Sequence, residues 1–123
     1  MKYKEAIEPH KEEISTFLNQ LPDNPIEIKG IQAKNELYIN GKKLSLARSL
    51  KVRNHSPAGY NWGYSGSGPA QSALAILLEY VDAKTAGTYY QDLKFGWVAG
   101  LPQTDFCQVV NLRQIMASII FGE

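Results

Sequence analysis

Residues 54–82 read NHSPAGYNWGYSGSGPAQSALAILLEYVD and join a glycine- and aromatic-rich loop to the most apolar helix that the sequence predicts. Pro69 fits the first helical position, because its fixed φ suits a helix and its missing N–H would have no intrahelical partner. Ser67 or Gly68 is then the expected N-cap residue. The junction combines unusual backbone chemistry with a candidate binding surface, which makes it the first candidate for a functional site.

The predicted helix is apolar around most of its circumference. Apolar residues recur at helical spacing, namely Ala70, Ala73, Leu74, Leu77, Leu78 and Val81. Ser72, Glu79 and Asp82 form the narrow polar side that remains. Burying about five large aliphatic side chains at roughly 1.5–3 kcal/mol each would make this helix the largest single contributor to the core.

Composition indicates one soluble globular domain spanning residues 1–123. The chain has 123 residues, of which 44% are apolar and 20% are charged, enough for a core without disulfides or metal. Thirteen basic and twelve acidic residues give a net charge of +1, which argues against a protein that binds nucleic acid by charge alone. We interpret the basic residues between Lys42 and Arg53 as a solvated strand face.

Several classes of protein are disfavoured by what the sequence lacks. Cys107 is the single cysteine, so no intramolecular disulfide can form and a reducing compartment is expected. No apolar run reaches the length of a membrane span, and the charged N-terminal residues do not resemble a signal peptide. His10 and His55 are far apart and no ligand pair shows metal spacing. We therefore expect a cytoplasmic protein without a metal or other cofactor.

The N-terminal half predicts one helix followed by a small sheet. Residues 3–20 are amphipathic and should begin a helix near Pro9, as a possible N-terminal addition (residues 1–22) to a core domain of residues 26–123. Residues 26–31 alternate as a strand. Strands at residues 36–39 and 43–46 should form a hairpin across Asn40-Gly41, because both residues tolerate the positive φ of a tight turn. Residues 47–53 fit either a short helical turn or the approach to a further strand, and the extended conformation is favoured for residues 50–53.

The C-terminal half predicts two more helices around one strand. Residues 83–95 are helical in pattern, residues 97–102 form a return segment, and residues 105–109 alternate as a short strand. Asn111 is the expected N-cap of a last helix. The order of elements predicts an α+β fold in which a small antiparallel sheet packs against the buried central helix and two or three further helices.

The loop and helix together resemble a family of short proteins of unknown function that occur in phages, integrated elements and bacterial genomes. The resemblance rests on Asn54-His55-Ser56-Pro57, on YNWGYSGSGPAQ at residues 60–71, and on the Ala/Leu-rich helix that follows. It covers roughly residues 36–120, so the helix at residues 3–20 lies outside it. The resemblance implies a role in phage or mobile-element biology and brings no catalytic residues with it.

The leading hypothesis is a binding site in the loop and the first turn of the central helix. Unpaired N–H groups at a helix start attract anions, glycine allows close approach, and aromatic side chains can flank a ligand. The candidate residues are Tyr60, Asn61, Trp62, Tyr64, Ser65, Gly66, Ser67, Gly68 and Gln71. The partner would be an unidentified protein or a small anionic ligand. In the alternative interpretation, the glycines serve tight turns and the aromatic residues close the core.

An enzyme is the less favoured hypothesis. The glycines match neither the phosphate-loop pattern nor the dinucleotide fingerprint, because no Lys-Ser or Lys-Thr and no third glycine follows. The run from Gly63 to Ser67 misses the nucleophile-elbow pattern by one residue, and we expect His55 to cap a turn or hydrogen-bond the loop. No catalytic residue is assigned, and the oligomeric state stays open. Exposure of Trp62 and Tyr64 would favour an interaction surface over core packing.

Overall fold

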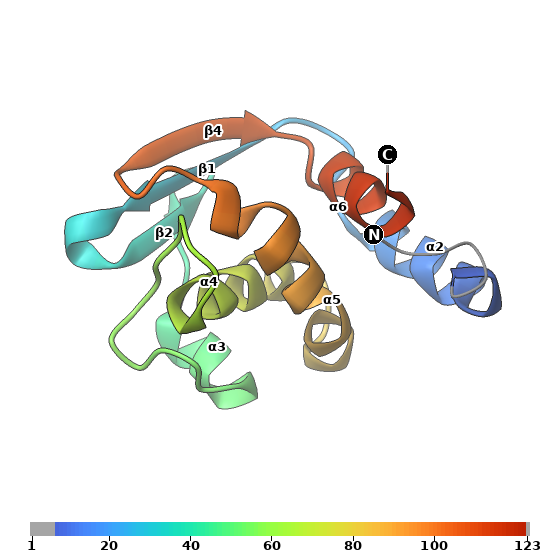
Figure 1. Cartoon of the computed structure of the whole chain (residues 1–123), viewed down its shortest axis with the longest axis horizontal. Helices are drawn as coiled ribbons and strands as arrows, with labels where there is room; N and C mark the ends of the chain where they lie inside the picture. The colour runs from blue at the N-terminus through green and yellow to red at the C-terminus, as the bar shows by residue number, and fades with distance from the viewer. Residues whose placement is uncertain (1–6, 123) are drawn as a thin grey trace.

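The computed structural model describes residues 7–122 and contains a four-stranded antiparallel sheet with helices against one face (Figure 1). The strands are β1 (Ile26–Ile31), β2 (Glu36–Ile39), β3 (Lys42–Lys43) and β4 (Phe106–Val110). They lie in the order β3-β2-β1-β4, so the last strand of the chain pairs with the first. The predicted α+β class is confirmed.

The hairpin at Asn40-Gly41 is confirmed by its backbone angles. Asn40 and Gly41 have φ values of 50° and 81°, as a two-residue hairpin turn requires. Asn40 also ties the turn to β1, because its N–H donates to the Glu27 carbonyl and its Oδ1 accepts from the Glu27 N–H, both at 2.9 Å. The predicted third strand is shorter than expected, since β3 holds only Lys42 and Lys43.

The expected extended conformation is wrong for residues 50–52, which belong to helix α3 (Leu46–Val52), and is confirmed only for Arg53. The Ser45 hydroxyl caps this helix by accepting from the Arg48 N–H at 3.2 Å. The Arg48 side chain then reaches the end of the central helix, where it donates to Glu79 and to the Leu78 carbonyl. A local cap and a distant anchor together stabilise this short helix.

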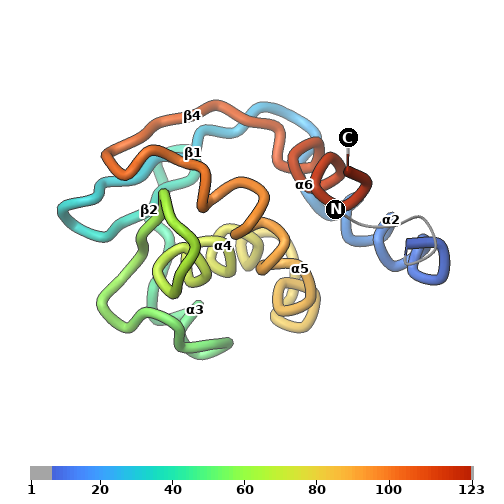
Figure 2. The backbone as a smooth tube through the Cα atoms, viewed as in Figure 1, coloured from blue at the N-terminus to red at the C-terminus, as the bar shows by residue number. Residues whose placement is uncertain are grey.

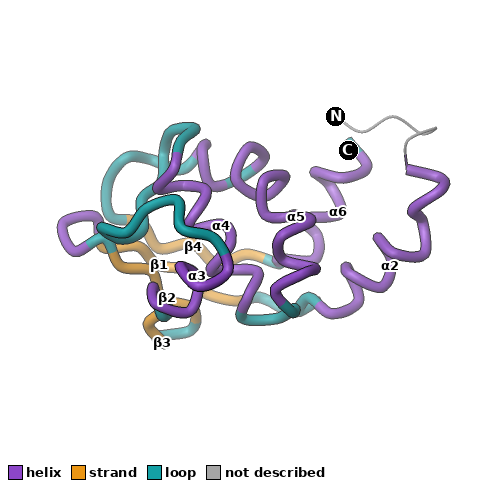
Figure 3. Tube along the Cα trace, turned by 90° about the horizontal axis from the view of Figure 1, so that it is seen from below, coloured by secondary structure: helices purple, strands orange, loops and turns teal. Residues whose placement is uncertain are grey.

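The remaining helices are α2 (Lys11–Gln20), α4 (Ser67–Leu78), α5 (Ala83–Gly96) and α6 (Leu112–Phe121), with three short 3-10 helices η1 (Glu8–His10), η2 (Gln32–Lys34) and η3 (Val98–Gly100). Helices α3 and α4 lie under one face of the sheet, and no helix of the described residues covers the opposite face (Figures 1 and 3). The backbone trace shows α2 and α6 side by side at the far end (Figure 2). Within residues 7–122, none of the helices combines the length and apolar character that a membrane span needs.

The central helix α4 is buried along almost its entire length, as expected, but its first turn differs from the prediction. Gly66 occupies the N-cap position without any side-chain hydrogen bond, Ser67 is the first helical residue, and Pro69 is the third. Gly66 is fully extended, at φ −165°, and lies under the Tyr64 ring, so the turn begins one residue earlier than propensity suggests. The predicted polar side is also narrower, because Ser72 is buried.

The N-terminal helix follows the predicted pattern, with Pro9 in η1 and α2 continuing from Lys11. The part of the prediction that concerns residues 3–6 lies outside the described residues. Arg113 at the start of α6 donates to the carbonyls of Asn19 and Leu21, which fixes the end of α2 to α6. Asn111 caps α6 as predicted, by accepting from the Gln114 N–H at 3.0 Å.

Candidate functional site

The loop between α3 and α4 is held from inside by two aromatic residues of the candidate site. Trp62 is completely buried, and its indole N–H donates to the Thr104 carbonyl at 2.8 Å. Tyr60 is also buried, and its hydroxyl donates to the Ser45 carbonyl at 2.9 Å. Both polar groups are therefore satisfied within the chain, which is the normal condition for buried Tyr and Trp.

Gln71 connects the loop to two helices. Its Oε1 accepts hydrogen bonds from the backbone N–H groups of His55 and Ser56, at 2.8 and 3.1 Å. Its Nε2 donates to the Ser49 hydroxyl of α3 at 2.9 Å, and the side chain is fully buried. The amide thus uses acceptor and donor groups inside the protein, in a position where the sequence had suggested contact with a ligand.

His55 contacts α5 instead of a serine of the loop. Its Nε2 lies 2.8 Å from the Tyr90 hydroxyl. Burial lowers the pKa of His55, and the positive charges of Arg53 and Lys94 lower it further. Among the described hydrogen bonds of His55, none reaches Ser65 or Ser67, so the geometry supplies no serine–histidine pair for nucleophilic catalysis.

The loop approaches α4 so closely that one glycine is required by space. A Cβ atom on Gly68 would lie 2.6 Å from the Cβ of Asn61 and 2.9 Å from the Tyr64 hydroxyl oxygen. Asn61 is further held by Ser72, whose hydroxyl accepts from the Asn61 N–H at 3.1 Å. The Asn61 Oδ1 accepts from the Trp62 N–H at 2.8 Å. Gly68 therefore allows two backbone segments to meet.

The exposed part of the candidate site is a tip that comprises residues 63–67. Tyr64 has 40% of its surface exposed, and Ser65 and Ser67 are also exposed. The tip is fixed at its base, because the Gly63 N–H donates to the Val98 carbonyl at 3.1 Å and Gln103 donates to the Gly63 carbonyl at 2.9 Å. The structure thus divides the nine candidate residues into a buried support and an exposed tip.

The start of α4 offers little to an anion. Pro69 has no N–H, and the Ala70 N–H already donates to the Gly66 carbonyl at 3.0 Å. Only the N–H groups of Ser67 and Gly68 remain from the first turn. The tip itself contains no lysine or arginine. The geometry therefore favours an aromatic contact surface over a phosphate site.

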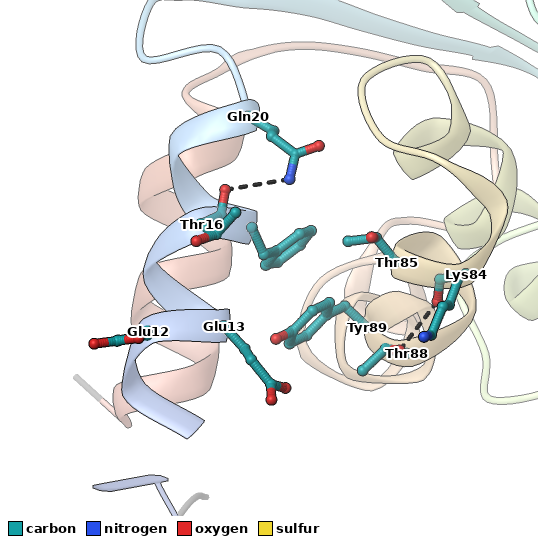
Figure 4. A pocket seen from close by; sticks show the side chains of 9 residues that line it. Glu12, Glu13, Thr16, Gln20, Lys84, Thr85, Thr88 and Tyr89 are labelled. Carbon is teal, nitrogen blue, oxygen red and sulfur yellow. Dashed lines mark hydrogen bonds between the residues drawn. The ribbon is translucent and has the colours of Figure 1, made fainter. Parts of the chain in front are cut away.

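A second feature, which the sequence did not indicate, is a hollow between α2 and α5 of about 440 Å³ (Figure 4). Phe17 and Tyr89 both line it, and their rings stack with centroids 3.9 Å apart and planes 7° from parallel. Burial raises the pKa of Tyr89, and the charges of Glu13 and Asp92 raise it further. Periodicity predicts that Phe17 faces inward, but no local signal shows which distant residue it meets. The residues around the hollow are Glu12, Glu13, Thr16, Phe17, Gln20, Lys84, Thr85, Thr88 and Tyr89.

The described residues hold no cluster of three or more side chains from His, Cys, Asp and Glu that could bind a metal ion. The fold and the site define a small α+β domain with an exposed tip that carries one aromatic side chain, Tyr64. The chain belongs to the Family of unknown function (DUF6166), whose model matches residues 28–118. The match begins earlier than the resemblance predicted, at residue 28 instead of 36, and it leaves α2 outside. Comparison with curated proteins and with solved structures finds no match.

Proposed function

We propose that this protein is a small binding protein that recognises another protein through its tip, residues 63–67. The observation that carries the proposal is Tyr64, a large aromatic side chain that is 40% exposed on a segment fixed at both ends. Aromatic side chains with a polar end are common anchors of protein interfaces, and a rigid anchor loses little entropy on binding. The partner would meet Tyr64 first and hydrogen-bond to Ser65 and Ser67.

We place this interaction in the cytoplasm and in the biology of phages or mobile elements. The lone exposed Cys107 suits a reducing compartment. The phage context rests on the resemblance of residues 36–120 to proteins of such elements. A small protein of this kind would act on a host protein or on another product of the same element, and no reaction is assigned to it.

The test is affinity capture with the wild-type protein and Tyr64→Ala from a bacterial lysate, followed by a direct binding measurement with each purified partner. Phe95→Ala is the matched control, because Phe95 is a 65% exposed aromatic residue on α5. We expect a partner that binds the wild type and Phe95→Ala and loses binding to Tyr64→Ala. Equal binding by all three forms would contradict the proposal.

A second candidate function is small-molecule binding in the hollow between α2 and α5. The stacked pair Phe17 and Tyr89 lines this hollow, and the volume of the hollow is in the lower part of the range of ligand sites. A thermal-shift panel of phosphates, nucleotides, sugars and short oligonucleotides tests it. A ligand that stabilises the wild type and Tyr64→Ala, but not Thr88→Arg, would bind in the hollow.

A further inference from the structure

The two edges of the sheet differ in the way that they meet solvent. One edge is β3, which has two residues, both lysines. Short, lysine-rich edge strands are a common way to prevent strands of other molecules from adding to a sheet. The other edge is β4, with the sequence Phe-Cys-Gln-Val-Val, which has no charge, no proline and no glycine. Only the β4 edge therefore lacks such protection.

The ladder of hydrogen bonds shows which backbone N–H and C=O groups of β4 point toward β1 and which point toward the open edge. The carbonyl of Glu27 accepts from the hairpin turn beside β2, so its backbone groups face β2. Alternate residues of a strand face opposite neighbours, so the backbone of Ile28 faces β4 and bonds to its partner Gln108. The N–H and C=O groups of Cys107 and Val109 consequently point away from β1, toward the open edge.

Two of the five side chains of β4, Cys107 and Val109, are exposed, whereas Phe106 is buried and Gln108 and Val110 are half-buried. Val109 is 69% exposed, the highest value among the large apolar residues that are exposed in the described part of the chain. Cys107 is exposed on the same face. No strand other than β1 pairs with β4 within residues 7–122, and β4 runs along the boundary of the molecule in Figure 1.

We propose that β4 pairs with β4 of a second copy of this chain, in antiparallel orientation, to form one continuous eight-stranded sheet across a twofold axis. With Gln108 on the axis, Cys107 lies opposite Val109 of the second copy, and Phe106 lies opposite Val110. Because the backbones of Cys107 and Val109 face outward, this register forms four hydrogen bonds across the axis.

The strand is complementary to itself in this register and in no adjacent one. Apolar side chains meet apolar side chains, the two Gln108 amides meet each other, and no charges are brought together. A shift in one direction would align Val109 with Asp105 of the second copy. A shift in the other direction would align Cys107 with Asn111, which already caps α6. Self-complementarity makes a second copy the fitting occupant of this edge.

The first test is the molar mass in solution, by light scattering over a series of concentrations. An interface of one strand pair is smaller than that of a permanent dimer, so the wild type should shift from 13.7 kDa toward twice that mass as concentration rises. Val109→Pro should stay monomeric, because it removes an outward N–H without breaking the ladder to β1. Val109→Thr, which keeps the N–H, should dimerise like the wild type.

The second test reads the register and does not depend on a proline. In a Cys107→Ser background, Gln108→Cys should form a disulfide-linked dimer under mild oxidation, because residue 108 meets itself at the axis. Val109→Cys in the same background should link more slowly. A wild type that is monomeric at every concentration would overturn the proposal. So would a dimer that Val109→Pro leaves intact and that Gln108→Cys does not link faster than Val109→Cys.

Discussion

At the scale of single residues, the side chain of Gln71 should contribute to stability more than to binding. Gln71→Leu would leave the backbone N–H groups of His55 and Ser56 without their acceptor, while the Ser49 hydroxyl would keep its hydrogen bond to the Leu46 carbonyl. Unsatisfied buried polar groups cost about 1–3 kcal/mol, so we expect a loss of that order in the free energy of unfolding. Urea denaturation measures it, with the exposed Gln103 replaced by Leu as control. Unchanged stability would contradict the buried role.

Two glycines provide a matched pair for the effect of a single methyl group. Gly68→Ala should destabilise the protein, because the new Cβ would lie 2.6 Å from Asn61. Gly87→Ala on α5 adds the same atom where nothing lies within 4 Å, and alanine is favoured over glycine in a helix by about 0.8–1.0 kcal/mol. The melting temperatures should move in opposite directions. A fall for both would indicate that α5 is constrained at Gly87 in another way.

The imidazole of His55 should make stability depend on pH. The folded state holds the pKa of His55 below its ordinary value of 6.5, chiefly through burial. The unfolded chain therefore binds more protons as the pH falls through that value, and stability decreases there. Above pH 6.5, the uncharged His55 makes its full contribution to the stability of the fold. The free energies of unfolding of the wild type and His55→Asn, measured over a range of pH, should converge as the pH is lowered toward 5. A constant difference between the two proteins would contradict the lowered pKa of His55.

At the scale of elements, the two helix starts predict different effects of capping mutations. Asn111→Ala should cost about 1 kcal/mol, because Asn111 caps α6. Ser67→Ala, which would cost about as much if Ser67 were an N-cap, should be almost neutral, since Ser67 is an exposed helical residue without a capping bond. Chemical denaturation of both variants checks this. Equal losses of stability in the two variants would show that Ser67 does cap α4.

The elements that could be predicted from sequence are those fixed by neighbouring residues. The Asn40-Gly41 turn, the Asn111 cap and the apolar pattern of α4 each depend on a few consecutive positions. Helix α3 was not predicted because Arg48 anchors it to the end of α4, a contact between residues that are distant in sequence. The sequence also could not predict that Trp62 is buried while Tyr64 is exposed, because local sequence does not show which way a loop side chain points.

At the scale of the whole molecule, α2 should be necessary for folding although the family match begins after it. Ile14, Phe17 and Leu21 are all buried. Their burial contributes at most about 5–9 kcal/mol, at roughly 1.5–3 kcal/mol each, which is comparable to the total stability of a small domain. A chain of residues 23–123 should therefore lack cooperative unfolding by circular dichroism. A sharp thermal transition in this truncated chain would show that the core domain folds alone.

The way in which the loop between α3 and α4 is held also decides where the protein can be engineered. Long surface loops are the usual places for inserted epitope tags, because most loops tolerate added length. Hydrogen bonds of Tyr60, Trp62 and Gln71 hold this loop to three different parts of the fold, so extra residues in the loop would displace buried groups. The hairpin turn at Gly41, where the surrounding space is open, is the better site for a tag.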